Sequence, residues 1–391
     1  MNTAGALPDP TFWRGRRVLV TGHTGFKGSW LTLWLLELGA KVMGVALDPP
    51  TKPSLFEQLR LTEIGLMDRR GDLRDGERLA QLVQQHQPQV VLHLAAQATV
   101  REGYRAPIDT WDINVLGSLQ LLEALRQLND TCAVVAVTTD KVYFNAECGK
   151  PFQEDDPLGG HDPYSASKAA MELAVASWRL SYCGQAPHQS PHLRLATART
   201  GNVIGGGDWG AERIVPDAIR ALQRGEPIAM RNPAAVRPWQ HVLEPLNGYL
   251  LLAETLASNL NPPCEAFNFG PDPACCSSVK ALVQELLRHW PGQWLDQHDP
   301  LAPHEAGVLQ LNSAKARQRL GWQPGWDVET ALARTATWYR AVHAGANPLD
   351  CCRADLACYL RRKSETTGVS PLMPEPGLRG SWAEGPIPSN A

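Results

Sequence analysis

Short β-rich runs alternate with helical patterns over the first half of this chain, from Arg17 to about residue 200. This alternation predicts an α/β fold, in which a doubly wound parallel sheet is covered by helices on both faces. The strands are expected at residues 17–21, 42–47, 90–94, 133–138 and 193–199, and the helices at residues 26–38, 76–86, 114–128 and 163–182. Because ligands of such sheets bind beyond the carboxyl ends of the strands, the residues that follow each strand are the first candidates for a site.

The overall composition argues against some classes of function. The 391 residues carry a formal net charge of −3 with acids and bases interspersed, which gives no sign of a basic surface for nucleic acid or membrane. The nine cysteines show no metal-like spacing, so free thiols in a reducing compartment are expected. The first ten residues lack the regions of a signal peptide, so we expect a cytoplasmic protein.

A glycine-rich loop, Thr-Gly-His-Thr-Gly-Phe-Lys-Gly at residues 21–28, follows the first predicted strand and opens the first predicted helix. Glycines allow the backbone to approach a pyrophosphate, and the start of a helix adds unpaired N–H groups and the positive end of its dipole. In this context the loop favours a Rossmann-type nucleotide site over a plain glycine turn. The candidate cofactor residues in it are Gly22, His23, Thr24, Gly25, Phe26, Lys27 and Gly28.

The identity of the nucleotide depends on Asp48, which follows the second predicted strand. A carboxylate there accepts hydrogen bonds from a ribose diol and repels a 2′-phosphate, so NAD is favoured over NADP. The alternative is that Asp48 only starts a turn before Pro49, and Lys52 nearby weakens the preference for NAD. Further candidates, expected to border the adenine and the nicotinamide ribose, are Asp72, Leu73, Ala95, Ala96 and Gln97.

A tyrosine and a lysine lie one turn apart near the start of the predicted helix 163–182. Asp162 and Pro163 are typical N-terminal helix residues, and Tyr164 and Lys168 then share one helix face. An ammonium near a phenol lowers the pKa of the phenol, so Tyr164 could remove a hydroxyl proton while hydride leaves the same carbon for a nicotinamide ring. The spacing alone is common in helices, but after a nucleotide loop and a polar strand end it favours catalysis.

These motifs together resemble the extended short-chain dehydrogenase/reductases of the NAD-dependent epimerase/dehydratase family, from about residue 12 to about residue 345. The resemblance also rests on residues 53–56 (Pro-Ser-Leu-Phe), 138–141 (Thr-Thr-Asp-Lys), 201–209 (Gly-Asn-Val-Ile-Gly-Gly-Gly-Asp-Trp), 237–241 (Arg-Pro-Trp-Gln-His) and 303–305 (Pro-His-Glu). The glycine and tyrosine–lysine motifs specify only the superfamily. Residues 138–141 and 205–209 resemble its sugar-nucleotide 4,6-dehydratases more specifically.

The resemblance implies NAD as cofactor and CDP-glucose as substrate, with C4 oxidised, water eliminated across C5 and C6, and hydride returned to C6. Tyr164, helped by Lys168 and Thr139, is implied as the base at the C4 hydroxyl, and Asp140 as the acid at the C6 hydroxyl. Related dTDP-glucose dehydratases carry a glutamate where this chain has Lys141. Lys141 is therefore either a neutral base at C5 or a charged support for the enolate.

The resemblance also implies a substrate lobe and a homodimer that pairs helices 114–128 and 163–182. Asn202, Arg213, Arg237 and His304 are the implied substrate residues, and no metal site is expected. We expect an NAD-binding Rossmann domain at 12–205, to which 241–270 returns, a sugar-nucleotide-binding lobe at 206–240 and 271–350, and a flexible tail at 365–391. The alternatives are another sugar-nucleotide 4,6-dehydratase, a 4-epimerase of the same fold, or a non-catalytic NAD-binding sensor.

Overall fold

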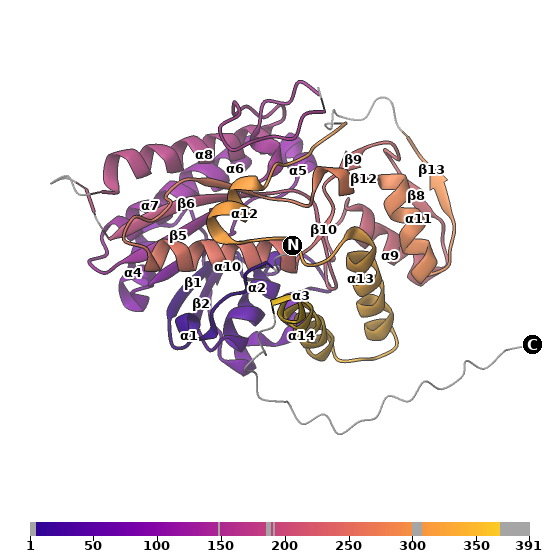
Figure 1. The fold of residues 1–391 in the computed structure, drawn as a ribbon, viewed down its shortest axis with the longest axis horizontal. Helices are drawn as coiled ribbons and strands as arrows, with labels where there is room; N and C mark the ends of the chain where they lie inside the picture. Colours follow the sequence, from indigo (N-terminus) through magenta and orange to yellow (C-terminus); the bar gives the residue numbers. More distant parts are fainter. Residues whose placement is uncertain (1–4, 148, 185–188, 191, 299–306, 368–391) are drawn as a thin grey trace, which may run out of the picture.

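The structure is a computed structural model that describes residues 5–147, 149–184, 189–190, 192–298 and 307–367 (Figure 1). Its centre is a seven-stranded sheet with the strand order β11-β6-β5-β4-β1-β2-β3, in which every neighbouring pair is parallel. The strands are β1 (Arg17–Thr21), β2 (Lys41–Ala46), β3 (Met67–Arg70), β4 (Val90–His93), β5 (Cys132–Val137), β6 (Leu193–Thr200) and β11 (Ala266–Phe269). The predicted doubly wound α/β fold is confirmed.

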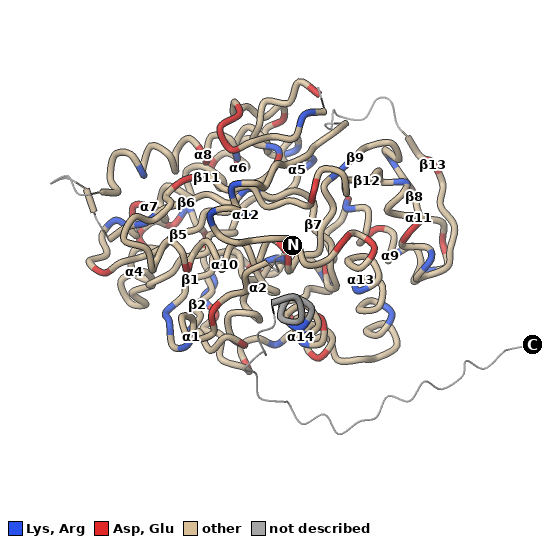
Figure 2. The backbone as a smooth tube through the Cα atoms, in the orientation of Figure 1, with Lys and Arg blue, Asp and Glu red and all other residues tan. Residues whose placement is uncertain are grey.

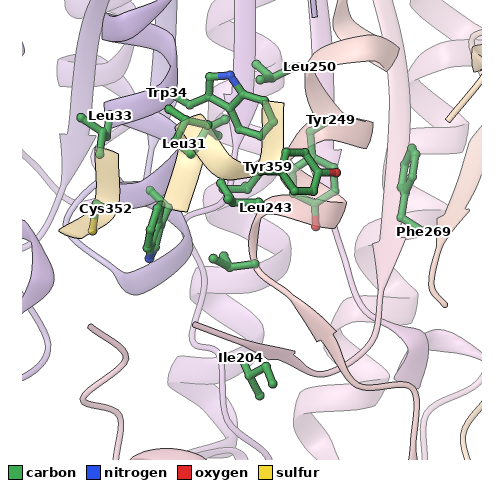
Figure 3. Packing of buried hydrophobic residues seen from close by; sticks show 14 of the residues in the cluster. Leu31, Leu33, Trp34, Ile204, Leu243, Tyr249, Leu250, Phe269, Cys352 and Tyr359 are labelled. Atoms are coloured by element: carbon green, nitrogen blue, oxygen red, sulfur yellow. The ribbon is translucent and has the colours of Figure 1, made fainter. Parts of the chain in front are cut away.

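The central strands are apolar along their whole length because helices cover both faces of the sheet. Along β5 every residue is buried, and alternate side chains enter two separate cores. Val135 packs in the core that contains α2 (Phe26–Glu37) and α10 (Leu243–Ser258), whereas Val134 packs in the core that contains α4 (Gly76–His86), α7 (Ser118–Arg126) and α8 (Pro163–Tyr182). In Figure 3, Trp34 of α2 lies close to Leu250 of α10 and to Tyr359 of the C-terminal helix.

The strand order reverses between β1 and β4, because β1 is followed outward by β2 and β3 on one side, and β4 by β5 and β6 on the other. Val18 of β1 is in register with Val42 on one side and with Val90 on the other. The connections that leave β1 and β4 therefore run in opposite directions and open a crevice at their carboxyl ends. This is the place where a nucleotide is expected in such a sheet.

The predicted helix 114–128 begins earlier in the structure than the sequence pattern indicates. Helix α6 (Pro107–Trp111) passes into a π-helical turn, η2 (Asp112–Gly117), and then into α7. The other predicted helices of the first half match α2, α4 and α8 to within one residue. Short elements complete this half: α1 (Pro10–Trp13), α3 (Leu55–Leu59), η1 (Leu61–Ile64), α5 (Val100–Arg105) and η3 (Asp140–Val142).

A smaller group of elements gathers on one side of the sheet, around α9, α11 and α13 on the right of Figure 1. It contains three two-stranded sheets, β7 with β10, β9 with β12, and β8 with β13. Its elements are β7 (Val203–Ile204), α9 (Ile214–Arg224), β8 (Ile228–Met230), β9 (Val236–Arg237), β10 (Gln240–His241), η4 (Pro273–Cys275), β12 (Ser277–Ser278), α11 (Val279–His289), β13 (Trp294–Asp296) and α13 (Val328–His343). Helix α12 (Ala314–Leu320) packs against β11, and α14 (Pro348–Thr367) packs against α13 and α3.

Charged residues of both signs are mixed along the backbone (Figure 2). Within the described ranges no helix is both long enough and apolar enough to cross a membrane. The expected tail begins at residue 365, and α14 continues to Thr367. Residues 368–391 of that predicted tail lie outside the described residues.

Candidate active site

The glycine-rich loop joins β1 to α2 at the crevice, and its glycines are required by close packing. Gly22 has a φ of +76°, and a Cβ atom there would lie 2.7 Å from the backbone nitrogen of Ala95, beyond β4. A Cβ atom on Gly28 would lie 2.1 Å from the carbonyl oxygen of Gly22. Gly25 is the N-cap of α2 and has no side chain to bond the first N–H groups of the helix. The loop is therefore a narrow backbone cradle at a helix N-terminus, which fits a pyrophosphate.

His23 points from this loop toward the neighbouring strands. Its ring leaves no room for a Cβ atom on Gly44 of β2, which would lie 2.4 Å from His23 Cγ. The Nε2 atom of His23 is 2.8 Å from Asp68 Oδ1, and the ring meets Phe56 edge to face at 5.3 Å. Burial lowers the pKa of His23, although Asp68 acts in the opposite direction. The structure thus places His23 as a support between the loop and β2 and β3.

The acidic cofactor candidates lie just beyond β2 and β3, and both are next to arginines. Asp48 follows β2 with its side chain 93% exposed, and its Oδ1 is 3.7 Å from Nη1 of Arg70. Asp72 follows β3 and pairs with Arg74 at 2.6 Å, which lowers the pKa of Asp72. Both carboxylates therefore stand at the edge where a ribose is expected, with a cation beside each.

The segment after β4 is held by hydrogen bonds to its neighbours. The backbone nitrogen of Ala95 donates to Thr21 Oγ1 at 3.2 Å, and the backbone nitrogen of Gln97 donates to Asn114 Oδ1 at 2.9 Å. Leu73 is buried against Gly117 of η2, while Ala96 is partly exposed at the crevice. These candidates line the same edge of the sheet as the glycine loop.

Tyr164 and Lys168 lie buried in the first two turns of α8. Asp162 caps the helix by accepting from the backbone nitrogen of Ser165 at 3.0 Å. Burial raises the pKa of Tyr164 to about 12, against a hydrogen bond with Thr139 that lowers it. Burial lowers the pKa of Lys168 to about 8, and its Nζ donates to the carbonyl oxygen of Val137, the last residue of β5, at 3.2 Å. The structure therefore brings the phenol, the ammonium and the end of β5 together.

Thr139 is the N-cap of the short turn η3, which follows β5 and begins with Asp140 and Lys141. Thr139 Oγ1 donates to Asp140 Oδ1 at 3.0 Å. Asp140 is 2% exposed, and its Oδ2 accepts no hydrogen bond within the described part of the chain. A Cβ atom on Gly201 would lie 3.0 Å from that oxygen, so glycine leaves the space beside it open. Lys141 follows with a partly exposed side chain.

Lys27 belongs to the glycine loop and lies near the candidate catalytic residues Asp140 and Lys168. Its ammonium lies within electrostatic range of Asp140, Lys168, Asp208 and Arg213. Burial lowers the pKa of Lys27 to about 7, and the nearby Arg213 acts in the same direction. Lys27 thus lies near two buried carboxyl groups, those of Asp140 and Asp208, and near two further basic side chains.

The substrate candidates lie beyond β6 and in the smaller lobe. Arg213 pairs with Asp208 at 3.0 Å, which raises the pKa of the arginine, and it also lies within electrostatic range of Tyr164. The backbone carbonyl oxygen of Asn202 accepts a hydrogen bond from the backbone nitrogen of Gln240 at 3.2 Å. Arg237 is buried, and its Nη1 donates to the carbonyl oxygens of residues 236 and 307. His304 lies outside the described residues.

The loop of residues 205–209 is fixed by aromatic side chains from distant elements. Trp30 Nε1 of α2 donates to the carbonyl oxygen of Gly206 at 2.9 Å, and a Cβ atom on Gly206 would lie 2.1 Å from Trp338 Cγ of α13. The hydroxyl of Tyr339 donates to the carbonyl oxygen of Asp208 at 2.6 Å. Side chains of α2 and α13 therefore fix the backbone of the loop that carries Asp208, the partner of Arg213.

Sequence reasoning missed two polar residues that hold the site together. Asn114 of η2 donates to Ser167 Oγ at 2.9 Å, next to the Tyr164 turn of α8. Glu172 of α8 forms a buried ion pair with Arg199 of β6. Glu172 is four residues after Lys168, so helical spacing could have placed it on the same face. No group of three or more potential metal ligands occurs in the described ranges.

Comparisons with known proteins agree with this geometry. The model of the NAD dependent epimerase/dehydratase family matches residues 18–270. The chain is 43% identical over 357 residues to the CDP-glucose 4,6-dehydratase of Salmonella typhimurium, covering 90% of this chain and 98% of that protein. It is 29% identical to a dTDP-glucose 4,6-dehydratase of Xanthomonas campestris pv. campestris, covering 82% and 92%. The crystal structure of DesIV, a dTDP-glucose 4,6-dehydratase from Streptomyces venezuelae with NAD and TYD bound, superposes with a TM-score of 0.71 at 25% identity, covering 85% of this chain and 99% of that one.

Proposed function

The chain belongs to the NAD-dependent epimerase/dehydratase family, and on this premise we propose that it is an NAD-dependent CDP-glucose 4,6-dehydratase. The reaction converts CDP-D-glucose to CDP-4-dehydro-6-deoxy-D-glucose and water. The observation that carries the proposal is the buried acid Asp140, which stands beside Thr139 and has one carboxyl oxygen without a hydrogen-bond donor among the described residues. A 4-epimerase needs the tyrosine and the cofactor, but it needs no acid at C6.

The glycine cradle of residues 22–28 fits NAD, because its backbone approaches Ala95 closely and it ends at the N-terminus of α2. When bound, NAD supplies a hydride acceptor and, once reduced, a hydride donor. Asp48 is the proposed partner of the adenine-side ribose. Asp72, Leu73, Ala95, Ala96 and Gln97 are the proposed border of the adenine and of the nicotinamide ribose.

We assign the proton transfers to three side chains, Tyr164, Asp140 and Lys141, and a supporting role to Thr139 and Lys168. Tyr164 takes the proton of the C4 hydroxyl, its hydrogen bond with Thr139 lowers the pKa of the phenol, and the positive charge of Lys168 stabilises the phenolate. The C4 ketone then makes the C5 proton acidic. Asp140 donates a proton to the C6 hydroxyl, which leaves as water while Lys141 takes the proton from C5. The C5–C6 double bond is reduced by hydride at C6 and a proton at C5, so the product keeps the ketone at C4.

The substrate is proposed to lie between this edge of the sheet and the smaller lobe. Arg213 and Arg237 carry the guanidinium groups that suit a diphosphate, and Asn202 adds an amide. By the family resemblance Arg237 is the better candidate of the two arginines, whereas Arg213 lies within electrostatic range of Tyr164 and Lys27. The proposed domain division stays at residues 12–205 with 241–270, and 206–240 with 271–350.

We propose that the protein is a cytoplasmic homodimer. The support is a set of apolar side chains that are exposed on η2 and α8, within the helices in which the sequence predicts the dimer contact, and on α6, which leads into η2. They are Ile108 (79% exposed), Trp111 (41%), Leu116 (55%), Leu173 (61%) and Leu180 (77%).

One assay tests the function. The protein is incubated with NAD and with CDP-, dTDP-, UDP- or GDP-linked glucose, and the sugar nucleotide is followed by mass spectrometry. We expect the loss of one water from CDP-glucose alone. An isomer of unchanged mass would indicate an epimerase, loss of water from another sugar nucleotide would reassign the substrate, and no change in any sample would favour an NAD-binding sensor.

A further inference from the structure

A buried ion pair lies directly beneath the proposed catalytic residues. Glu172 of α8 and Arg199 of β6 have side chains that are 3% and 4% exposed. Arg199 binds both carboxylate oxygens, with Nε 3.0 Å from Oε1 and Nη2 2.9 Å from Oε2. Two threonine hydroxyls complete the set, because Thr138 Oγ1 donates to Oε1 at 2.5 Å and Thr197 Oγ1 donates to Oε2 at 2.7 Å. All four hydrogen bonds to Glu172 thus come from β6 and from the residue that follows β5.

Stability of the fold is a weak reason for such a pair. Removing two charges from water is costly, and buried ion pairs are often no better for stability than apolar residues of the same volume. Their better supported benefit is geometric, because a bidentate arginine and two hydroxyl donors fix the carboxylate in one orientation. The question is which part of the molecule needs this fixed geometry.

Two contacts lead from Glu172 to the proposed catalytic group. Thr138 is the residue immediately before Thr139 and Asp140, so its bond to Glu172 fixes the point at which the backbone turns into η3. Lys168 lies one helical turn before Glu172, and the negative charge of Glu172 favours its protonated form. The carboxylate of Glu172 therefore acts on Lys168 through its charge, and on the turn that carries Asp140 through its bond to Thr138.

The other end of the pair is also fixed. Arg199 Nη1 donates to the hydroxyl of Tyr143 at 2.9 Å, and that hydroxyl donates to Asn268 Oδ1 of β11 at 2.7 Å. Tyr143 directly follows η3, so the turn is held on both sides, by Thr138 before it and by Tyr143 after it. The network spans α8, β6, β11 and the segment that follows β5.

We propose that Glu172 and Arg199 are positioning residues of the catalytic site, which hold Thr138 and Tyr143 so that the turn between them presents Thr139 and Asp140 to the substrate. The proposal rests on the proposed function for the identity of the reaction. It differs from a purely structural role because it assigns the effect to one particular hydroxyl, that of Thr138.

The test uses two matched variants, Thr138→Val and Thr197→Val. Each removes one threonine hydroxyl from Glu172 at nearly constant shape, and in each case the affected oxygen keeps its bond to Arg199. Only Thr138 adjoins the catalytic turn. We expect Thr138→Val to lower kcat about ten- to a hundredfold with KM for CDP-glucose within about twofold, because misplacement of catalytic groups has effects of this size. Thr197→Val should keep kcat within about twofold, and Thr138→Ser should restore it.

A second measurement does not depend on turnover. Hydrogen–deuterium exchange of the peptides that cover residues 138–145 should become faster in Thr138→Val and stay unchanged in Thr197→Val. Equal losses of kcat in the two valine variants, or wild-type kcat in Thr138→Val, would overturn the inference. If the wild-type protein releases no water from CDP-glucose, the proposed function fails by itself, and the exchange rates of the two variants still decide the inference.

Discussion

At the scale of single residues, the turn η3 places an acidic and a basic side chain next to each other in the chain. Asp140 is buried beside Thr139, whereas the neighbouring Lys141 has a partly exposed side chain. This difference suits the division of labour in the proposed reaction. An acid that must give up a proton benefits from a dry site, and a group that exchanges the C5 proton with solvent needs access to water.

The role of Lys141 can be tested with Lys141→Met and Lys141→Arg. Lys141→Met should abolish the incorporation of solvent deuterium at C5, while the reduction of bound NAD, read at 340 nm, continues. Lys141→Arg keeps the positive charge but cannot act as a base, because arginine does not lose its proton in proteins. If Lys141 is the base, the arginine variant should be as inactive in C5 exchange as the methionine variant.

Lys150→Met is the matched control for this experiment. Lys150 lies in the same segment after β5, 3.8 Å from Asp156, and has an exposed side chain. Its removal should leave C5 exchange unchanged. Undiminished turnover of Lys141→Met would reject Lys141 as the base, and restored exchange in Lys141→Arg would show that only its charge matters.

The candidate residues that the sequence revealed are those that stand in short contiguous motifs at strand ends. Tyr164 and Lys168 share a helix face, and Thr139 and Asp140 are adjacent, so local patterns were sufficient. Glu172 and Arg199 were missed because they are 27 positions apart, and their partnership depends on how α8 lies against β6. Helical spacing relates Glu172 to Lys168, but nothing in the local sequence of either segment shows that Glu172 pairs with Arg199.

At the scale of elements, the same contrast separates the strands. Continuous apolar runs such as β5 are visible in the sequence because burial on both faces excludes polar residues. The strand β11 is four residues long and contains Asn268, whose side chain bonds Tyr143, so it does not read as an apolar run. The helical segment that begins at Pro107 was placed too late, because it runs through the π-helical turn η2, which does not have the 3.6-residue period of an α-helix.

The contact between the N-terminal helix α1 and Glu254 of α10 should make the free energy of unfolding depend on pH. Glu254 of α10 accepts from Trp13 Nε1 at 2.5 Å and from the backbone nitrogen of Asp9 at 2.8 Å. Burial raises the pKa of Glu254 to about 7 from an ordinary 4.5. Between these two values the folded state binds a proton that the unfolded state does not, so the free energy of unfolding falls as pH rises through this window.

Glu254→Gln removes this loss because glutamine stays neutral and its oxygen can accept the same two hydrogen bonds. We expect the variant to exceed the wild type in stability at pH 8 by about 2 kcal/mol, after a discount for the partial exposure of the side chain, and to equal it near pH 5. Thermal unfolding at the two pH values measures the difference. The exposed Glu63→Gln is the control, and an advantage of Glu254→Gln that is the same at both pH values would contradict the prediction.

At the scale of the whole molecule, the C-terminal helix α14 ties the two parts together. Tyr359 of α14 meets Trp34 of α2 edge to face at 5.8 Å and donates to Glu244 Oε2 of α10 at 2.8 Å (Figure 3). Cys352 of the same helix accepts from Trp338 Nε1 at 3.3 Å, and Trp338 is the residue that packs on Gly206. The helix therefore supports the loop that holds Asp208, although it lies far from the site in the sequence.

The proposed dimer is a property of the whole molecule and is tested by charge. Leu173 and Leu180 lie on the exposed side of α8, two helical turns apart, and both side chains are more than half exposed. If this face is covered by a second copy, Leu173→Glu and Leu180→Glu place unpaired carboxylates in an apolar interface, which is costly. The double variant should be a monomer by size-exclusion chromatography with light scattering, where the wild type is a dimer.

The control for this prediction is Leu260→Glu, because Leu260 is 96% exposed and follows α10 rather than lying on α8. A charge there should leave the dimer intact, since an isolated exposed leucine contributes little to association. The double variant should still be folded and should melt in a cooperative transition, because neither leucine belongs to the buried cores. A wild-type monomer would reject the proposed dimer, whereas a dimeric double variant would move the interface to another face of the molecule.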